Sequence, residues 1–221
     1  MTQIELVEEA AADVVDGFFV RYGRWTAQQA LAELPETPRM TVEVLDGSLV
    51  VSPRRSLRHQ TTVLELGIAL KRVVRAAGYG MHPQVKVVVG EELVCPDLTV
   101  ATRQGDDVSC VDAEETVLVA DLVLGCYERV ERLARARAYA AGKIGWYLRV
   151  ELSDDDATVT LYELVDGGYR PVALASAGAR FAMRKPFPFD LDPTTLVHRG
   201  RGALVDVPPQ RGIRLDPPGA A

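Results

Sequence analysis

One carboxylate stands out in an apolar stretch near the middle of the chain. Residues 90–100 read GEELVCPDLTV, in which Asp97 follows Pro96 and precedes aliphatic and β-branched residues typical of a strand. An aspartate in such a run is disfavoured unless it is solvated, paired or bound to a metal. Asp97 is therefore either a solvated acid at the start of a strand or part of a functional site.

Two further residues are candidates for the same site. Glu43 lies in an alternating, strand-like run, so it faces either a cleft or the solvent. His59 lies near the start of a long helical stretch. A histidine there can contact phosphate or a water beside a site, and it can equally be an ordinary capping or surface residue.

Arginines gather in two places along the sequence. The first group is Arg54, Arg55 and Arg58, and the second, at helical spacing, is Arg129, Arg132 and Arg135. Clusters of this kind make salt-sensitive phosphate contacts that do not depend on base sequence, or they form a solvated basic face that balances nearby acids. The sequence leaves both alternatives open.

The composition is that of an ordinary globular protein. The chain has 221 residues, of which 48% are hydrophobic and 25% charged, and its net charge of −6 does not give the strong positive field of a dedicated nucleic-acid binder. It contains no apolar run long enough for a membrane span, and its acidic N-terminus is unlike a secretory signal. Three cysteines without a Cys-x-x-Cys pair favour a reducing compartment. We therefore expect a cytoplasmic protein with no membrane partner.

Periodicity and turn residues predict a chain of mixed helices and strands. In order, the expected helices are 1–16, 27–34, 56–77 and 127–141, and the expected strands are 40–45, 48–52, 85–89, 93–100, 116–126, 146–152, 158–164 and 169–175. Thr26 and Ser56 are the predicted N-caps, and Gly142 is the predicted left-handed residue after the last helix. The apolar stripe of the long helix comprises Val63, Leu64, Leu66, Leu70, Val73, Val74 and Ala77.

This order of motifs resembles a known family. The motifs are Trp25-Thr26, Leu34-Pro35, 43–47 (EVLDG), Ser52-Pro53, His59, Pro96-Asp97, 121–123 (DLV) and 139–147 (YAAGKIGWY). Together they resemble the putative restriction endonuclease family with the PD-(D/E)xK nuclease fold. The resemblance implies an α+β fold: a restriction-endonuclease-like mixed sheet flanked by helices, with a C-terminal antiparallel meander. The resemblance covers 25–197, which we take as the nuclease-like domain. The apolar periodicity before it predicts an N-terminal helical extension at 1–24, and the glycine-, proline- and arginine-rich composition after it predicts a tail at 198–221 without fixed structure.

The resemblance also implies a reaction. Members of the family look like Mg²⁺-dependent DNA endonucleases, in which the aspartate of the Pro-Asp pair and a glutamate on the next strand hold the metal, while a helical lysine positions or activates water. Carried over to this chain, Asp97 is the metal ligand and a catalytic residue, and Glu43 and His59 are further catalytic candidates. Arg58, Arg132 and Arg135 are the phosphate-binding candidates. DNA is the implied partner, and a homodimer is compatible with the sequence.

The chain departs from the family pattern at two of the three catalytic positions. Gly125 stands four residues after Asp121, where the glutamate is expected, and the lysine has no match in 131–139. Glu128 and Glu131 remain as substitute acids, whereas an arginine cannot act as a base because it stays protonated. Two hypotheses follow: an active endonuclease, or a degenerate nuclease-fold protein that binds nucleic acid or protein. A third is an interaction module that pairs through its meander or an edge strand.

Overall fold

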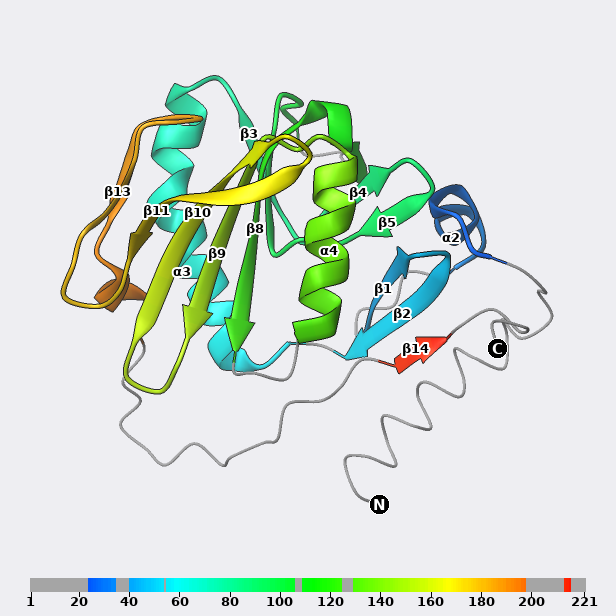
Figure 1. The fold of residues 1–221 in the computed structure, drawn as a ribbon, viewed down its shortest axis with the longest axis horizontal. Helices are drawn as coiled ribbons and strands as arrows, with labels where there is room; N and C mark the ends of the chain where they lie inside the picture. The colour runs from blue at the N-terminus through cyan, green and yellow to red at the C-terminus, as the bar shows by residue number, and fades with distance from the viewer. Residues whose placement is uncertain are drawn as a thin grey trace, which may run out of the picture.

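Two six-stranded sheets form the frame of the described part of the chain (Figure 1). The computed structural model describes residues 24–34, 40–53, 55–105, 109–124, 129–197 and 213–215. The hairpin sheet has the order β14-β2-β1-β5-β4-β7, and the meander sheet has the order β11-β10-β9-β8-β6-β3. The predicted α+β architecture is confirmed, while the expected helix 1–16 lies outside the described residues.

The elements have the following bounds. The hairpin sheet contains β1 (Met40–Leu45), β2 (Ser48–Pro53), β4 (Lys86–Val89), β5 (Glu92–Val94), β7 (Cys110–Asp112) and β14 (Ile213–Leu215). The meander sheet contains β3 (Gly80–Pro83), β6 (Leu98–Ala101), β8 (Thr116–Leu124), β9 (Trp146–Leu152), β10 (Ala157–Val165) and β11 (Gly168–Ala175). A small ribbon contains β12 (Phe181–Met183) and β13 (Phe189–Leu191). The helices are α2 (Ala27–Glu33), α3 (Leu57–Ala76) and α4 (Arg129–Ala141), with 3-10 turns η1 (Ala113–Glu115) and η2 (Pro193–Leu196).

The prediction of one strand over 93–100 is wrong, because the chain changes sheets inside it. Strand β5 pairs with β1 and β4 in the hairpin sheet, whereas β6 pairs with β3 and β8 in the meander sheet. Pro96 has no N–H to donate to a ladder, so pairing is interrupted between the two strands. Asp97 therefore lies where the chain crosses from one sheet to the other.

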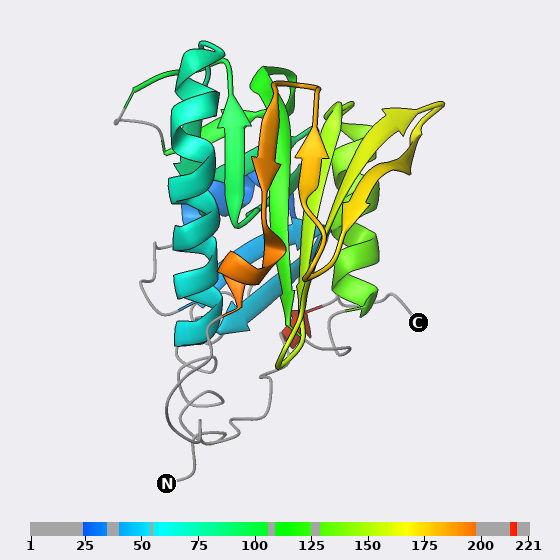
Figure 2. The ribbon, with the colours of Figure 1, turned by 90° about the vertical axis from the view of Figure 1, so that its left-hand side faces the viewer.

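Helix α3 covers one face of the meander sheet. Ser56 caps it by accepting the N–H of His59, and Gly78 follows its end with a φ of 83°. The inner face is packed into the largest core cluster, together with β6, β8, β9, β10 and η2, through Val63, Leu66, Leu70 and Val74. Leu64, predicted for the same stripe, is instead exposed. Figure 2 shows α3 standing along one side of the molecule.

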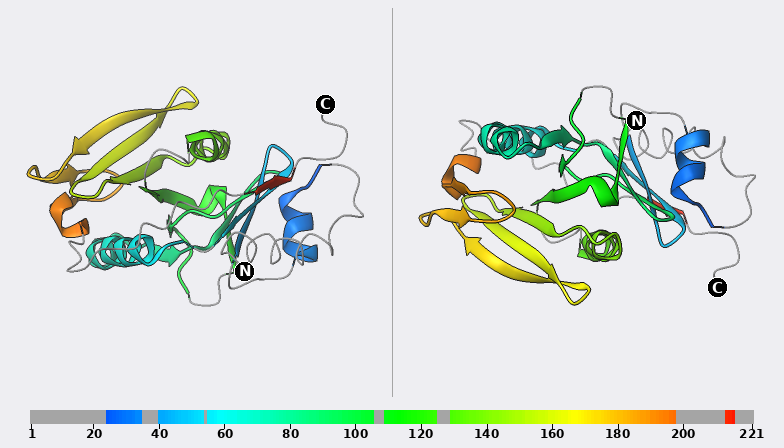
Figure 3. Two further views of the ribbon diagram at one scale, coloured as in Figure 1. Left: turned by 90° about the horizontal axis from the view of Figure 1, so that it is seen from below. Right: turned by 90° about the horizontal axis from the view of Figure 1, so that it is seen from above.

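Helix α4 packs between the two sheets. Its buried residues Ala138 and Tyr139 join a core cluster with Val119 and Tyr147 of the meander sheet and Val87 of the hairpin sheet. The end-on views in Figure 3 show the helix next to strands of both sheets. The hairpin sheet is therefore covered by α4 on one face and by α2 on the other.

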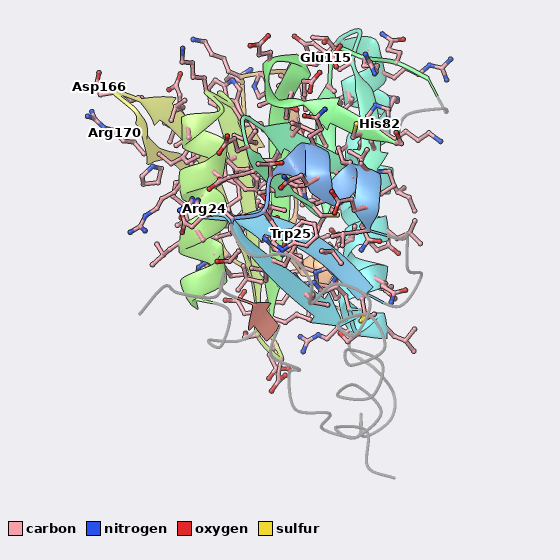
Figure 4. The ribbon with its side chains drawn as sticks, turned by 90° about the vertical axis from the view of Figure 1, so that its right-hand side faces the viewer. Arg24, Trp25, His82, Glu115, Asp166 and Arg170 are labelled. Carbon is pink, nitrogen blue, oxygen red and sulfur yellow. The ribbon has the colours of Figure 1, made fainter. Side chains whose placement is uncertain are left out.

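Helix α2 is held by its cap and by the first hairpin. Thr26 and Gln29 form a capping box, and the N–H of Trp25 donates to the carbonyl of Gly47 at 2.9 Å. Figure 4 labels Trp25 beside the β1–β2 hairpin. The hairpin turn itself places Asp46 and Gly47 at φ values of 53° and 76°, as its Asp-Gly sequence predicts.

The meander is confirmed, and several short strands were not predicted. Strands β9, β10 and β11 pair antiparallel in succession, and β8 pairs parallel with β9. Strands β3, β7 and β12 were missed because each has only three or four residues. In the C-terminal tail, Ile213–Leu215 pairs with β2, so the expectation of no fixed structure fails for these residues. In the described residues, none of the helices is both long and apolar enough to cross a membrane.

Gly142 has a different role from the predicted one. The left-handed residue after α4 is Lys143, with a φ of 57°. A Cβ at Gly142 would instead lie 2.8 Å from Cγ1 of Val89 and 2.9 Å from Cβ of Ala113. Glycine is required here because α4 ends in close contact with the hairpin sheet.

We expect Gly142→Ala to lower the free energy of unfolding by about 1 to 3 kcal/mol, because the added methyl group overfills a packed contact. Urea denaturation measures this value. Gly145→Ala is the matched control, since a Cβ there meets nothing within 4 Å. An equal effect of the two substitutions would contradict the close-approach explanation.

Candidate active site

Glu43 on β1 forms a buried ion pair with α4. The Glu43 side chain is fully buried, and Arg135 donates from Nε to its two oxygens at 3.0 and 3.1 Å and from Nη2 to Oε2 at 2.5 Å. Oε1 also accepts the N–H of Cys95 at 2.9 Å. The sequence alternation left the direction of Glu43 open because β1 is covered on both faces, with Val44 packed against α2.

Asp97 and His59, both predicted from sequence, are in contact. Their side chains are almost fully buried, and His59 Nε2 lies 3.1 Å from Asp97 Oδ2, which also accepts the N–H of Leu122 at 2.8 Å. Burial opposes ionisation of Asp97, but His59, the positive charge of Arg55 and the Leu122 N–H together hold its pKa below the ordinary value. Asp97 is therefore an ionised, internally paired carboxylate.

Asp121 on β8 is a third buried carboxylate. It accepts the hydroxyl of Tyr139 at 3.3 and 3.2 Å. Burial raises the pKa of Asp121 to about 6; the Arg135 charge opposes this rise, and the charges of Asp97 and Glu43 add to it. Burial also raises the pKa of Tyr139, so its hydroxyl remains a proton donor.

Asp97 and Asp121 are neighbours at the start of the β6–β8 ladder. The first pair of this antiparallel ladder is Leu98 with Ala120, and the two acids adjoin that pair in sequence. The N–H of Leu122 donates to Asp97 Oδ2, and the negative charge of Asp97 adds to the rise in the pKa of Asp121, because like charges repel. The two carboxylates respond differently, because Asp97 stays ionised while Asp121 holds its proton into mildly acidic pH. Environments that separate two pKa values in this way are found at acid–base sites.

These residues define a buried polar cluster. Its members are Glu43, His59, Asp97, Asp121, Arg135 and Tyr139. Glu43, His59, Asp97 and Arg135 are site residues predicted from sequence, whereas Tyr139 and Asp121 were predicted only as members of the 139–147 and 121–123 motifs. The spacing of four between Arg135 and Tyr139 indicates a shared helix face and could have joined them. The contact of Asp121 with this cluster depends on the register between β6 and β8, which the sequence does not reveal.

The other predicted phosphate ligands lie outside the buried polar cluster. Arg58 donates to Asp154 Oδ1 at 3.2 Å and to the carbonyl of Ser153. Arg132 is paired with Glu151 at 3.4 Å. Both pairs are more exposed than that of Arg135, so the three arginines do not form one phosphate site.

Some candidates cannot be placed. Arg54, Gly125 and Glu128 lie outside the described residues, and the side chains of Arg129 and Glu131 are likewise not described. His82 is partly exposed, with Nε2 3.1 Å from the carbonyl of Arg103, so it takes no part in these contacts. Burial first, and then the charge of Glu43, raise the pKa of Cys95 to about 12, so its thiol is not a nucleophile at neutral pH.

Comparison with known proteins identifies the fold and then the family. The fold is nuclease-like: the chain matches a crystal structure described as a putative nuclease belonging to DUF820 from Anabaena variabilis, with a TM-score of 0.53 and 14% sequence identity over 70% of this chain and 84% of that chain. The profile of the Uma2 family, described as putative restriction endonuclease, matches residues 28–196. The chain belongs to this family. A search of curated proteins finds no match.

Restriction-endonuclease-like families are generally metal-dependent, so the fit of a divalent ion can be tested here. Mg²⁺ requires hard oxygen ligands that are free to coordinate. Both oxygens of Glu43 are held by Arg135, and Oδ2 of Asp97 is held by two N–H groups. Among the described residues, no three His, Cys, Asp or Glu side chains are grouped so that they could hold a metal ion. The described side chains do not fit the metal.

Removing Arg135 should be far more costly than removing a surface arginine. Arg135→Met leaves the Glu43 charge buried and unpaired, which should lower the free energy of unfolding by about 3 to 5 kcal/mol. Arg132→Met, at a more exposed pair, should cost within about 1 kcal/mol. The double variant Glu43→Leu/Arg135→Met should recover much of the loss. Urea denaturation compares the variants, and equal losses at Arg132 and Arg135 would contradict this account.

Asp121 should make stability depend on pH. Between its ordinary pKa of 3.8 and the raised value of about 6, the folded chain holds a proton that the unfolded chain has lost. Its contribution to stability therefore falls as pH rises through this window, by on the order of 3 kcal/mol, and stays low above it. Asp121→Asn cannot ionise, so the stability of the wild type relative to this variant should fall from about pH 4 to about pH 7.

Urea denaturation at several pH values measures this difference. Asp155→Asn, in the exposed turn after β9, is the control and should leave the pH profile unchanged. A constant difference between wild type and Asp121→Asn over the whole range would rule out the shifted carboxylate.

Proposed function

We propose that this chain is a catalytically degenerate member of its family, which binds nucleic acid on a nuclease fold without hydrolysing the phosphodiester. The observation that carries the proposal is the Arg135 guanidinium, which holds both oxygens of Glu43 and interacts electrostatically with Asp121. The alternative is an active Mg²⁺-dependent DNA endonuclease, for which family membership and the buried Asp97 argue.

The charge balance of the buried polar cluster favours the degenerate form. A cluster of carboxylates in a dry interior requires positive charge, which in a metal-dependent nuclease the metal supplies. Here Arg135 supplies a permanent positive charge between Glu43 and Asp121, and His59 pairs with Asp97. Because an arginine neither loses its proton nor coordinates water, it neutralises the acids without supplying hydrolytic chemistry.

Nucleic-acid binding is proposed for the N-terminal end of α3. Arg55 and Arg58 lie there, and neither is fully buried. The positive charge of Arg55 acts on Asp97. The Arg58 pair with Asp154 is weak competition for phosphate, because the Asp154 side chain is almost completely exposed. Helix N-terminal N–H groups and arginines both favour phosphate oxygens. Contacts of this type position a nucleic-acid backbone without reading its sequence.

The test combines a cleavage assay with a mobility-shift assay on the full chain. Supercoiled plasmid incubated with Mg²⁺ or Mn²⁺ should stay intact with the wild type and with Asp97→Ala. A DNA fragment should shift at low salt, and the affinity should fall steeply as salt rises, because released counterions drive phosphate binding. Arg55→Ala/Arg58→Ala should weaken the shift about tenfold or more.

Arg170→Ala is the matched control, because this exposed arginine lies in the β10–β11 hairpin at the opposite end of the molecule (Figures 1 and 4). It should leave the shift unchanged. Cleavage by the wild type that is lost in Asp97→Ala would overturn the degenerate form. Absence of both cleavage and shift would overturn nucleic-acid binding.

A further inference from the structure

Helix α3 carries apolar side chains on the side that faces away from the core. Leu57 is 81% exposed, and Leu64 and Ile68 are each 61% exposed. At 100° per residue, these three side chains fall within about 20° of one line along the helix, opposite Leu66. In Figures 2 and 3, α3 lies at the outside of the described part of the chain, with no helix or strand beyond it. Aligned aliphatic side chains on such a face indicate a contact surface rather than scattered exposure.

The spacing along this face is that of a coiled-coil seam. Intervals of four and three residues alternate between six exposed positions: Leu57, Thr61, Leu64, Ile68, Lys71 and Arg75. Such an alternation averages about 3.5 residues, the repeat that brings the a and d side chains of one helix against a second helix. A seam of this kind is narrower than the face by which a helix packs on a core. We call these six residues the outer seam of α3.

The outer seam is apolar at one end and basic at the other. Lys71 and Arg75 form its C-terminal end, and Arg72 flanks them. Among the described residues, none of these three cations forms an ion pair. The helix contains one acid, Glu65, beside the apolar part. A complementary surface is therefore apolar opposite the three aliphatic side chains and acidic opposite the basic end.

A second copy of α3 does not supply that surface. In a parallel pair, each seam residue faces the same residue of the other copy, so Lys71 meets Lys71 and Arg75 meets Arg75. In an antiparallel pair centred on the aliphatic side chains, Arg58 on the flank lies close to Arg72, and Glu65 lies close to Glu65. Both arrangements oppose like charges, which disfavours association.

A lipid surface also fits the outer seam less well than a helix does. Helices that lie in a membrane interface bury a large apolar face. On α3, Lys71 and Arg75 lie on the seam itself, and Thr61 interrupts its apolar part. The carboxylate of Glu65 would moreover lie near anionic headgroups. A single partner helix, in contrast, contacts only the seam and its flanks.

We propose that the outer seam of α3 binds an acidic amphipathic helix of another protein. The apolar residues of this helix lie on Leu57, Leu64 and Ile68, and its carboxylates pair with Lys71 and Arg75. Burial of the aliphatic side chains supplies most of the affinity, while the opposite charges set the direction and register of the partner. The inner face of α3 is packed in the core, so the seam is held in place before the partner binds. This inference does not depend on the proposed function.

A designed peptide tests the proposal on the full chain. The probe is a fluorescent helical peptide of about 21 residues, with leucine or isoleucine at its seam positions and glutamates opposite the basic end. Fluorescence anisotropy at low salt should show binding, and Leu64→Gln/Ile68→Gln should weaken it about tenfold or more. Val172→Gln/Leu174→Gln is the matched control, because these side chains of β11 are 50% and 66% exposed, and it should leave binding unchanged.

Charge reversal gives an independent readout. Lys71→Glu/Arg75→Glu should weaken binding of the acidic peptide about tenfold or more, and it should create binding of a second peptide in which lysines replace the glutamates. Both side chains are exposed, so circular dichroism should show unchanged folding.

The proposal would be overturned if the wild type bound neither peptide, or bound the acidic and the basic peptide equally. Light scattering that shows a dimer in the wild type and a monomer in Leu64→Gln/Ile68→Gln would make a second copy the occupant. Vesicles of phosphatidylcholine and phosphatidylserine test a membrane. Adsorption of the wild type that is lost in the same variant, without peptide binding, would make the occupant a lipid surface.

Discussion

The ion pair between Arg135 and Glu43 is the interaction on which the arrangement of the molecule depends. It joins α4 to β1 across the interior, and it is the means by which a glutamate can be fully buried in the hairpin sheet. A bidentate pair fixes the distance and the rotation of its partners, because the guanidinium and the carboxylate meet along two bonds. The same guanidinium influences Asp121 on the meander sheet. One side chain of α4 is thus linked to both sheets.

A second constraint acts where the chain crosses between the sheets at Pro96. The new ladder begins at Leu98, one residue after Asp97, and the crossing places Asp97 close to Leu122 and Asp121 of β8. Two carboxylates in this position cannot both ionise at low cost. The structure places His59 and the Leu122 N–H on one of them, and a tyrosine hydroxyl on the other. The division of protonation states follows from the partners and not from the acids themselves.

Local signals were sufficient for much of the fold. The caps at Thr26 and Ser56, the Asp46-Gly47 turn and the apolar run of β8 each determine their own element, and these predictions agree with the structure. The sheet change between β5 and β6 was missed, because both strands have the same composition and only their partners differ. The left-handed backbone conformation after α4 was predicted at Gly142 and is found at Lys143. Glycine adopts this conformation far more often than lysine, so the sequence favours the wrong residue of the two.

The site shows the same division between local and distant information. Asp97 and His59 were found because each lies in a recognisable motif, and their contact spans 38 residues of sequence. The partner of Arg135 lies 92 residues away on a strand buried on both faces, where alternation carries no information about direction. From its positive charge, Arg135 was predicted to bind phosphate, whereas in the folded chain it binds the carboxylate of Glu43. Whether an arginine faces solvent or a buried acid is decided by tertiary structure alone.

The pairing of Ile213–Leu215 with β2 bears on where the folding unit ends. The family match stops at residue 196, yet the hairpin sheet ends with β14, beyond that boundary. A chain shortened to the matched region would keep β1 on one side of β2 but leave the edge at Leu49–Val51 without β14. An open edge of this kind, on a strand with buried Leu49, Val50 and Val51, is a template for pairing between molecules and for aggregation. A chain expressed for study should therefore extend at least through β14, because the backbone hydrogen bonds of the hairpin sheet continue beyond residue 196, where the family match ends.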